Sequence, residues 1–138
     1  MLILVIQGTE CRERDSVITQ LTHLTRPQVV TIDVSFLPTA TLRLDRLKVL
    51  LHRSPKVLNV VVGANSKEEI AFLREQGAMF FNLHRRFPSH LLDIEGAIHP
   101  EDRLVSPTLE SEPDVDVYRP DEAFSECFAR HKFRRKVA

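Results

Sequence analysis

The sequence predicts an α/β fold, a three-layer, Rossmann-like sandwich built on a mostly parallel sheet of four to five strands. Four short apolar runs rich in Val and Ile lack strict alternation, which is typical of strands buried on both faces. Segments with helical spacing of apolar residues separate these runs, and each connection is long enough for a crossover. The 138 residues, with 19 basic and 19 acidic side chains, suit one compact domain and exclude a collagen-like or wholly disordered chain.

The apolar runs are expected to form strands in the order Leu2–Ile6, Val29–Val34, Val57–Val62 and Met79–Leu83. The first run is too short for a membrane helix, which needs about 20 apolar residues, and it lacks the basic start of a signal peptide. Cys11 and Cys127 are far apart and fit neither a disulfide framework nor a Cys-rich zinc site. We therefore expect a cytoplasmic protein without membrane association.

Helices are expected over Asp15–Thr25, over Thr41–His52, over Ser66–Gln76 and from about Ser89 onward. In the third helix, Ser66 and Glu69 have the spacing of a capping box, and Gly77 provides the stop. The fourth helix is expected to bury a stripe made of Leu91, Leu92, Ile94 and Ile98.

The composition divides the chain into three parts. An α/β core is expected over 1–105, an acidic linker or arm over 106–119, and a C-terminal helix with a basic tail over 120–138. The cations of the tail are Arg130, Lys132, Arg134, Arg135 and Lys136. Such a run can bind the phosphate backbone of a nucleic acid, but it can equally be solvated or fold against the acidic arm.

The turn after the first expected strand has the spacing of a phosphate-binding loop. Gly8 is followed by Arg14, Asp15 and Ser16 at a helix start, close to the pattern G-x-x-x-x-G-K-[ST]. In that pattern the glycines let backbone N–H groups surround a phosphate, the lysine neutralises it and the hydroxyl holds Mg²⁺.

This loop resembles that of the phage and bacterial deoxynucleoside monophosphate kinases, which ends in G-K-D-T, with Arg14 at the lysine position. The segment 35–38 is similar to that family's S-F-A-D-P, and the segment 60–85 is similar to its V-V-x-D-V-R-F-x-N-E…F-L-R-E-x-G-x…R stretch. The resemblance implies a site for a nucleotide with Mg²⁺ formed by Gly8, Arg14, Asp15, Ser16 and Arg85.

The chain departs from that family at the charged positions. Glu13 stands where a loop glycine belongs, and Gly63 and Ser66 stand where the family has an aspartate and an arginine. Little is then left to hold Mg²⁺ or neutralise a transferred phosphoryl group. We therefore expect a non-catalytic, nucleotide-kinase-like domain that binds a nucleotide or a protein partner, a second copy of itself included. An active kinase with an atypical loop, and a plain strand-to-helix turn, stay open.

Asp33, at the end of the second expected strand and followed by Pro38, also resembles the phosphoacceptor of response-regulator receiver domains. The acid pair that such a domain needs after its first strand is Gln7-Gly8 here, and its hydroxyl position is Gly63. The resemblance therefore implies a pseudo-receiver, a signalling module that acts by interaction. Alternatively, Asp33 caps a loop or pairs with a base such as Arg43.

Histidines and phenylalanines are the two other groups of residues with a potential functional role. The six histidines match no specific zinc pattern, so no metal ligands are assigned; they are His23, His52, His84, His90, His99 and His131. Phenylalanines concentrate in the second half of the chain, at Phe80, Phe81, Phe87, Phe124, Phe128 and Phe133. They are expected to pack in the core, or to form a partner surface if the C-terminal helix does not fold back on the sheet.

Overall fold

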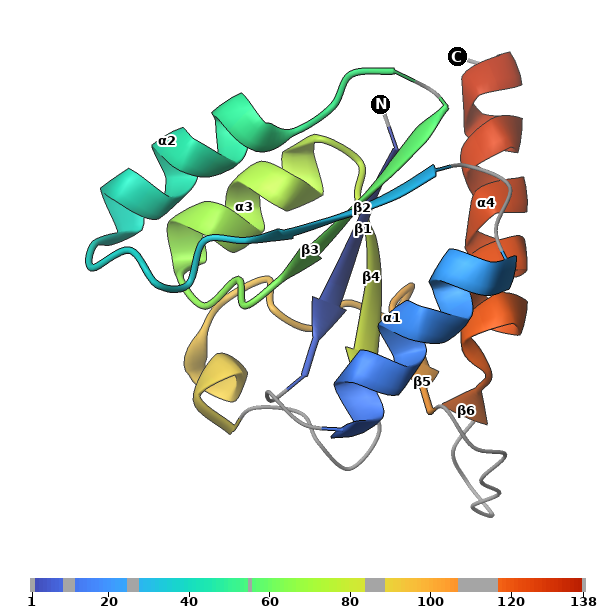
Figure 1. The fold of residues 1–138 in the computed structure, drawn as a ribbon, viewed down its shortest axis with the longest axis horizontal. Helices are drawn as coiled ribbons and strands as arrows, with labels where there is room; N and C mark the ends of the chain where they lie inside the picture. Colours follow the sequence, from blue (N-terminus) through green and yellow to red (C-terminus); the bar gives the residue numbers. More distant parts are fainter. Residues whose placement is uncertain are drawn as a thin grey trace.

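The computed structural model describes residues 2–8, 12–24, 28–54, 56–83, 89–106 and 117–137. Within these residues the chain alternates strands with helices (Figure 1). The elements are β1 (Leu2–Gln7), α1 (Arg12–Leu24), β2 (Gln28–Asp33), α2 (Ala40–Leu50), β3 (Val57–Val62), α3 (Lys67–Glu75), β4 (Met79–Leu83), the 3-10 helix η1 (Ser89–Asp93), β5 (Arg103–Val105), β6 (Val117–Tyr118) and α4 (Pro120–Val137).

The strands form one parallel sheet in the order β2-β3-β1-β4-β5-β6. The predicted α/β class is confirmed: the architecture is a Rossmann-like sandwich. The described sheet has six strands, whereas four to five were expected. The strands that the sequence did not reveal are β5 and β6, which are only three and two residues long. Strands that short leave no apolar run to detect, and β6 lies inside the segment that was expected to be an acidic arm.

The direction of each crossover decides which face a helix covers. From β1 the chain moves past β3 to the sheet edge at β2, whereas every later connection moves in the opposite direction. Since crossovers share one hand, this reversal places α1 on the opposite face from α2 and α3. Figure 1 shows α1 and α4 together on one side of the sheet and α2 and α3 together on the other.

Two apolar cores follow, one on each face of the sheet. The α1 side contains Leu2, Leu4, Ile6, Val17, Leu21, Leu58, Val60, Val62, Phe81, Leu83, Val105, Ala123, Phe124 and Cys127. The α2 side contains Ile3, Val5, Ile32, Val34, Leu47, Leu51, Val61, Ala64, Ile70, Leu73, Phe80, Leu91 and Ala97. Alternate residues of β1 belong to alternate cores, so this central strand is apolar on both faces. The burial of Phe124 shows that α4 packs against the sheet instead of standing free.

A second contact fixes α4 to β5. The guanidinium of Arg103 donates from Nη2 to Glu126 of α4 and lies 5.5 Å from the centre of the Tyr118 ring. Burial alone lowers the pKa of Arg103, but its hydrogen bond to Glu126 and the attraction of that carboxylate outweigh burial and raise the pKa above its ordinary value. The C-terminal helix is therefore held by an ion pair as well as by apolar packing.

The prediction of a long fourth helix from Ser89 was wrong. The segment forms only the short η1, which buries Leu91 but leaves Leu92 63% and Ile98 54% exposed. Gly96 adopts a φ of 84°, a left-handed conformation that ends any helical course. The apolar stripe read from the sequence is therefore not one face of a helix.

Arg74 of α3 holds this crossover in place. Its Nη1 and Nη2 donate to the two carboxylate oxygens of Asp102 at 2.6 and 2.7 Å, and its Nε donates to the Gly96 carbonyl at 3.1 Å. Its guanidinium carbon also lies 3.5 Å from the centre of the Phe80 ring. The hydrogen bonds of the planar Arg74 guanidinium thus hold the segment between η1 and β5, which lacks the hydrogen bonds of a helix.

We expect Arg74→Lys to destabilise the protein, because lysine keeps the charge but loses the bidentate and stacking geometry. The free energy of unfolding, measured by urea denaturation, should fall by about 1.5–3 kcal/mol. Lys67→Ala is the matched control, since Lys67 and Glu95 form an exposed pair 3.8 Å apart in the same region. It should change stability by about 0.5 kcal/mol or less. Equal losses in the two variants would contradict the assigned role of Arg74.

Candidate functional site

The carboxyl edge of the sheet is the expected location of a ligand. In open α/β sheets ligands bind beyond the strand ends, at the point where the strand order reverses. Here that point lies at β1, whose following helix α1 covers one face while α3, the helix after its neighbour β3, covers the other. The residues at the ends of β1, β2, β3 and β4 therefore define the candidate site.

Gly8 follows β1, as the predicted loop requires, and its surroundings explain why it is glycine. A Cβ atom at this position would lie 2.8 Å from both Cβ and Cδ2 of Leu83 on β4. Such a contact is far too short, so any side chain here would push the two strands apart. Close packing against β4 therefore requires the glycine, whether or not a phosphate binds.

The three other loop residues lie inside α1, because this helix begins at Arg12 and not near Asp15. Asp15 is exposed, and its carbonyl accepts a hydrogen bond from the Thr19 hydroxyl. The partly buried Ser16 hydroxyl is 3.4 Å from Nε2 of Gln20. The structure therefore places these side chains along the first turns of a helix.

Arg14 differs from its neighbours, because it shares the helix face of Val17, which packs on the sheet. Its Nε is buried and has no hydrogen-bond partner within the described part of the chain. As one of the first residues of α1 it also lies where backbone N–H groups lack helical acceptors. A cation and the N-terminus of a helix thus coincide at this end of the sheet.

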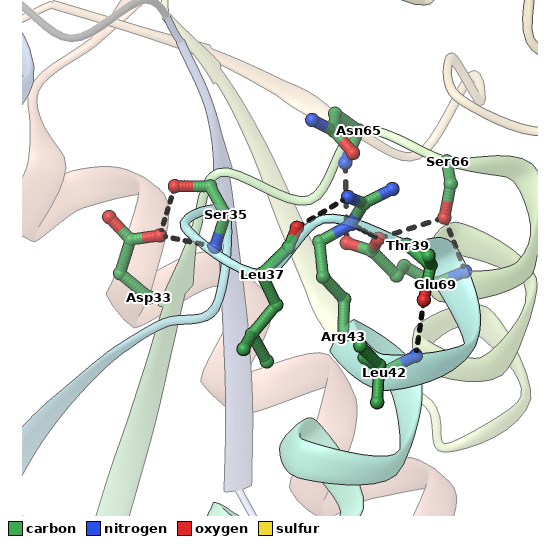
Figure 2. A network of polar contacts seen from close by, with 9 residues as sticks. All are labelled: Asp33, Ser35, Leu37, Thr39, Leu42, Arg43, Asn65, Ser66 and Glu69. Carbon is green, nitrogen blue, oxygen red and sulfur yellow. Dashed lines mark hydrogen bonds and ion pairs between the residues drawn. The ribbon is translucent and has the colours of Figure 1, made fainter.

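Asp33 caps the turn that follows β2. Its Oδ1 accepts from the backbone N–H of Ser35 at 2.9 Å and from the Ser35 hydroxyl at 2.6 Å (Figure 2). Gly63, after the adjacent β3, has a φ of 76°, and a Cβ there would lie 3.0 Å from this same Oδ1. Of the two structural roles expected for Asp33, the structure has the loop cap and not the pair with Arg43.

Arg43 instead pairs with Glu69, whose side chain is fully buried at the start of α3. Its Nε lies 2.6 Å from Oε1 of Glu69, and its Nη1 donates to the Leu37 carbonyl at 2.9 Å. The Ser66 hydroxyl donates to the same carboxylate and accepts from the Glu69 backbone N–H, so the predicted helix cap at Ser66 is confirmed. Figure 2 shows how this network joins the loops that follow β2 and β3.

Gln7 and Asn82 are the polar residues that the sequence analysis missed. Gln7 is the last residue of β1 and Asn82 the last but one of β4; they are partners in the register of these strands and are only 2% and 7% exposed. Both amide atoms of Gln7 and the Oδ1 of Asn82 are buried without a hydrogen-bond partner among the residues that the structure describes. The signal in the sequence is a carboxamide that directly follows or interrupts an apolar run. The sequence analysis names Gln7 only because a receiver domain has an acidic residue at that position.

A separate hollow of about 210 Å³ lies between the C-terminal ends of α2 and α3. Its lining consists of Lys48, Leu51, Arg53, Phe72 and Gln76. Because these helices run antiparallel to the strands, their C-terminal ends belong to the amino edge of the sheet. The hollow is therefore remote from the candidate site.

Several predicted site residues lie outside the described residues. Arg85 belongs to the segment 84–88, and most of the acidic arm belongs to 107–116. The backbone of α4 is described through Val137, but the side chains of its tail are not, namely Arg130, Lys132, Arg134, Arg135 and Lys136. Within the described ranges no group of three or more His, Cys, Asp or Glu side chains could hold a metal ion. Nor does any described helix have the length and apolar character needed to span a membrane.

Comparison of the chain with protein-family models, with curated proteins and with solved structures finds no match. The fold and the geometry of the carboxyl edge therefore have to support any functional assignment themselves.

Removing Arg43 should destabilise the carboxyl edge, because Arg43→Ala leaves the Glu69 carboxylate buried without its cation. Unfolding free energy should fall by about 3–5 kcal/mol in urea denaturation. Arg46→Ala removes an exposed arginine from the same helix and should change stability by about 0.5 kcal/mol or less. A variant Arg43→Ala as stable as Arg46→Ala would show that the network is not structural.

Proposed function

We propose that this protein is a non-catalytic, nucleotide-kinase-like domain that binds a nucleotide at the carboxyl edge of its sheet. The observation that supports it most is the buried, unpartnered amide of Gln7, at the end of the strand where the connections reverse. Buried polar groups in folded proteins are nearly always hydrogen-bonded, so an unpaired one at a ligand-binding edge favours a missing ligand group. Arg14, on the α1 side of the same strand end, provides a cation for phosphate.

The charges of this edge argue against phosphoryl transfer. Glu13 and Asp15 add negative charge to the first turn of α1, where the transferred group would bind. The cation of Arg43 is already engaged by Glu69 and Leu37. Stabilising a phosphoryl transition state takes several converging cations or a metal ion, and the described residues of this edge offer few of them. Binding without turnover is the function that these residues favour.

The sheet order favours this proposal over the pseudo-receiver. Doubly wound receiver sheets have the order 2-1-3-4-5. In this chain β3 lies between β2 and β1, so the turn capped by Asp33 is separated from the end of β1 by a whole strand. One carboxylate oxygen of Asp33 also already accepts two hydrogen bonds from Ser35 in its own turn. A phosphoacceptor needs its metal-binding groups close beside it, which this arrangement does not favour.

A thermal-shift panel of nucleoside mono-, di- and triphosphates, with and without Mg²⁺, tests the proposal. A nucleotide present at 100 times its Kd should add about 2.7 kcal/mol of stability, a shift of several degrees. Arg14→Ala should abolish the shift, while Arg12→Ala, an exposed arginine in the same turn, should keep it.

The same samples should show no phosphoryl transfer from ATP to a deoxynucleoside monophosphate. A panel without any shift would refute nucleotide binding and direct the search to protein partners. Turnover at the rate of an ordinary kinase would refute the non-catalytic assignment and restore the active-kinase alternative.

A further inference from the structure

We infer that Gln7 and Asn82 recognise the uncharged hydrogen-bonding edge of a nucleobase, and that phosphate is not their ligand. This inference rests on the proposed nucleotide binding. It assigns the base of the nucleotide to Gln7 and Asn82 and the phosphate to Arg14. Its basis is the position of two buried carboxamides, their missing partners and their lack of charge.

The two side chains leave the sheet on the same face. Ile3 and Val5 of β1 pack in the core on the α2 side, so Gln7, which continues that alternation, also points to this side. Phe80 of β4 packs in the same core, and Asn82 follows it by two residues. Because Gln7 and Asn82 are register partners on neighbouring strands, their carboxamides lie next to each other at the end of the sheet.

Asn59 shows how this sheet treats a carboxamide that is only structural. It is fully buried on β3, yet its Nδ2 donates to the carbonyls of Leu2 and His52 at 2.8 and 2.9 Å. Its Oδ1 accepts from the His52 backbone N–H at 2.8 Å. Every hydrogen-bonding atom of Asn59 is therefore used, whereas three such atoms of Gln7 and Asn82 are not. The unpaired groups are at the carboxyl edge, and the paired one is at the amino end.

Gln7 and Asn82 do not pair with each other in the structure, since both amide atoms of Gln7 and the Oδ1 of Asn82 have no hydrogen-bond partner among the described residues. An unpaired buried amide atom destabilises a folded protein, because it has lost its hydrogen bonds to water without replacing them. A partner from outside the described residues is needed, and it must present both a donor and an acceptor.

An uncharged ligand group fits these requirements better than a phosphate. The two side chains are neutral and adjoin the apolar core on their face of the sheet. A phosphate here would be a buried anion facing two neutral carboxamides, and the described cations Arg43 and Arg74 on this face are already engaged by Glu69 and Asp102. A nucleobase edge instead offers a donor beside an acceptor, and Asn and Gln pair with such edges through two hydrogen bonds.

The positions of the amides and of Arg14 divide the ligand between two faces. Arg14 belongs to α1 and so lies on the opposite face of the sheet from the two carboxamides. A nucleotide that crosses the end of β1 would place its base at Gln7 and Asn82 and its phosphate at Arg14. Binding of the base alone should therefore depend on the amides and not on the arginine.

Isothermal titration with free nucleosides (adenosine, guanosine, cytidine and thymidine) tests the inference without any phosphate. The full chain should bind one of them in preference to the others. Gln7→Met, which keeps the size of the side chain and removes its polar atoms, should weaken that binding at least tenfold, as should Asn82→Leu. Gln28→Met, the same change at an exposed strand position, should bind the nucleoside as the native chain does.

Thermal unfolding of the same variants without ligand provides a second readout. Gln7→Met should leave the melting temperature unchanged or raise it, because it removes an unsatisfied group. Asn59→Leu should lower the melting temperature, because it breaks three hydrogen bonds. A melting temperature for Gln7→Met as low as that of Asn59→Leu would overturn the inference, since the amide would then be structurally paired.

The outcomes also separate this inference from the proposed function. If nucleotides bind and depend on Arg14, but nucleosides do not bind or Gln7→Met binds them normally, the proposed function stands and the base-recognition role is overturned. If neither nucleotides nor nucleosides bind, both are overturned.

Discussion

The structure depends on one constraint, the complete burial of β1 between two neighbours and two helix layers. Every residue of this strand is buried, with β3 paired on one side and β4 on the other. Its side chains pack alternately in the two apolar cores, so helices have to cover both faces of the sheet. The first connection and the later ones meet that requirement by running in opposite directions across the sheet. That reversal also places the end of β1 at a switch point of the kind where open α/β sheets bind ligands.

A sheet buried on both faces has to pair every polar group that enters it. Asn59 is paired by backbone groups, Glu69 by Arg43 and the cap of α3, and Asp102 by Arg74. In each case the polar side chain links two segments that are distant in the sequence, so pairing it also fixes the tertiary arrangement. Gln7 and Asn82 are buried to a similar degree, but both amide atoms of Gln7 and the Oδ1 of Asn82 have no partner among the described residues. These atoms therefore add no hydrogen bond to the described fold.

The sequence predicts what depends on local pattern and misses what depends on distant partners. The runs that form β1 to β4 were recognised because burial on both faces removes polar residues from a strand. The start of α1 was missed because its first turn, Arg12 to Asp15, is charged and shows no apolar spacing. The apolar stripe after Ser89 predicted a helix. The segment instead forms only the short η1, and the left-handed Gly96 and its hydrogen bond with Arg74 give the following residues a non-helical course. The Arg43–Glu69 pair joins residues 26 positions apart, which no local spacing reveals.

The same distinction changes how the phosphate-loop pattern is understood. Gly8, the glycine of that pattern, is required by the approach of Leu83, so it has a structural cause that any similar sheet would share. A match at such positions indicates a fold and says little about chemistry. Residues that the fold does not need are more informative, and Gln7, Asn82 and Arg14 are of this kind, because burying them without partners opposes folding. Unless a ligand uses them, apolar residues at these positions would make a more stable protein, so their presence favours a binding role at the end of β1.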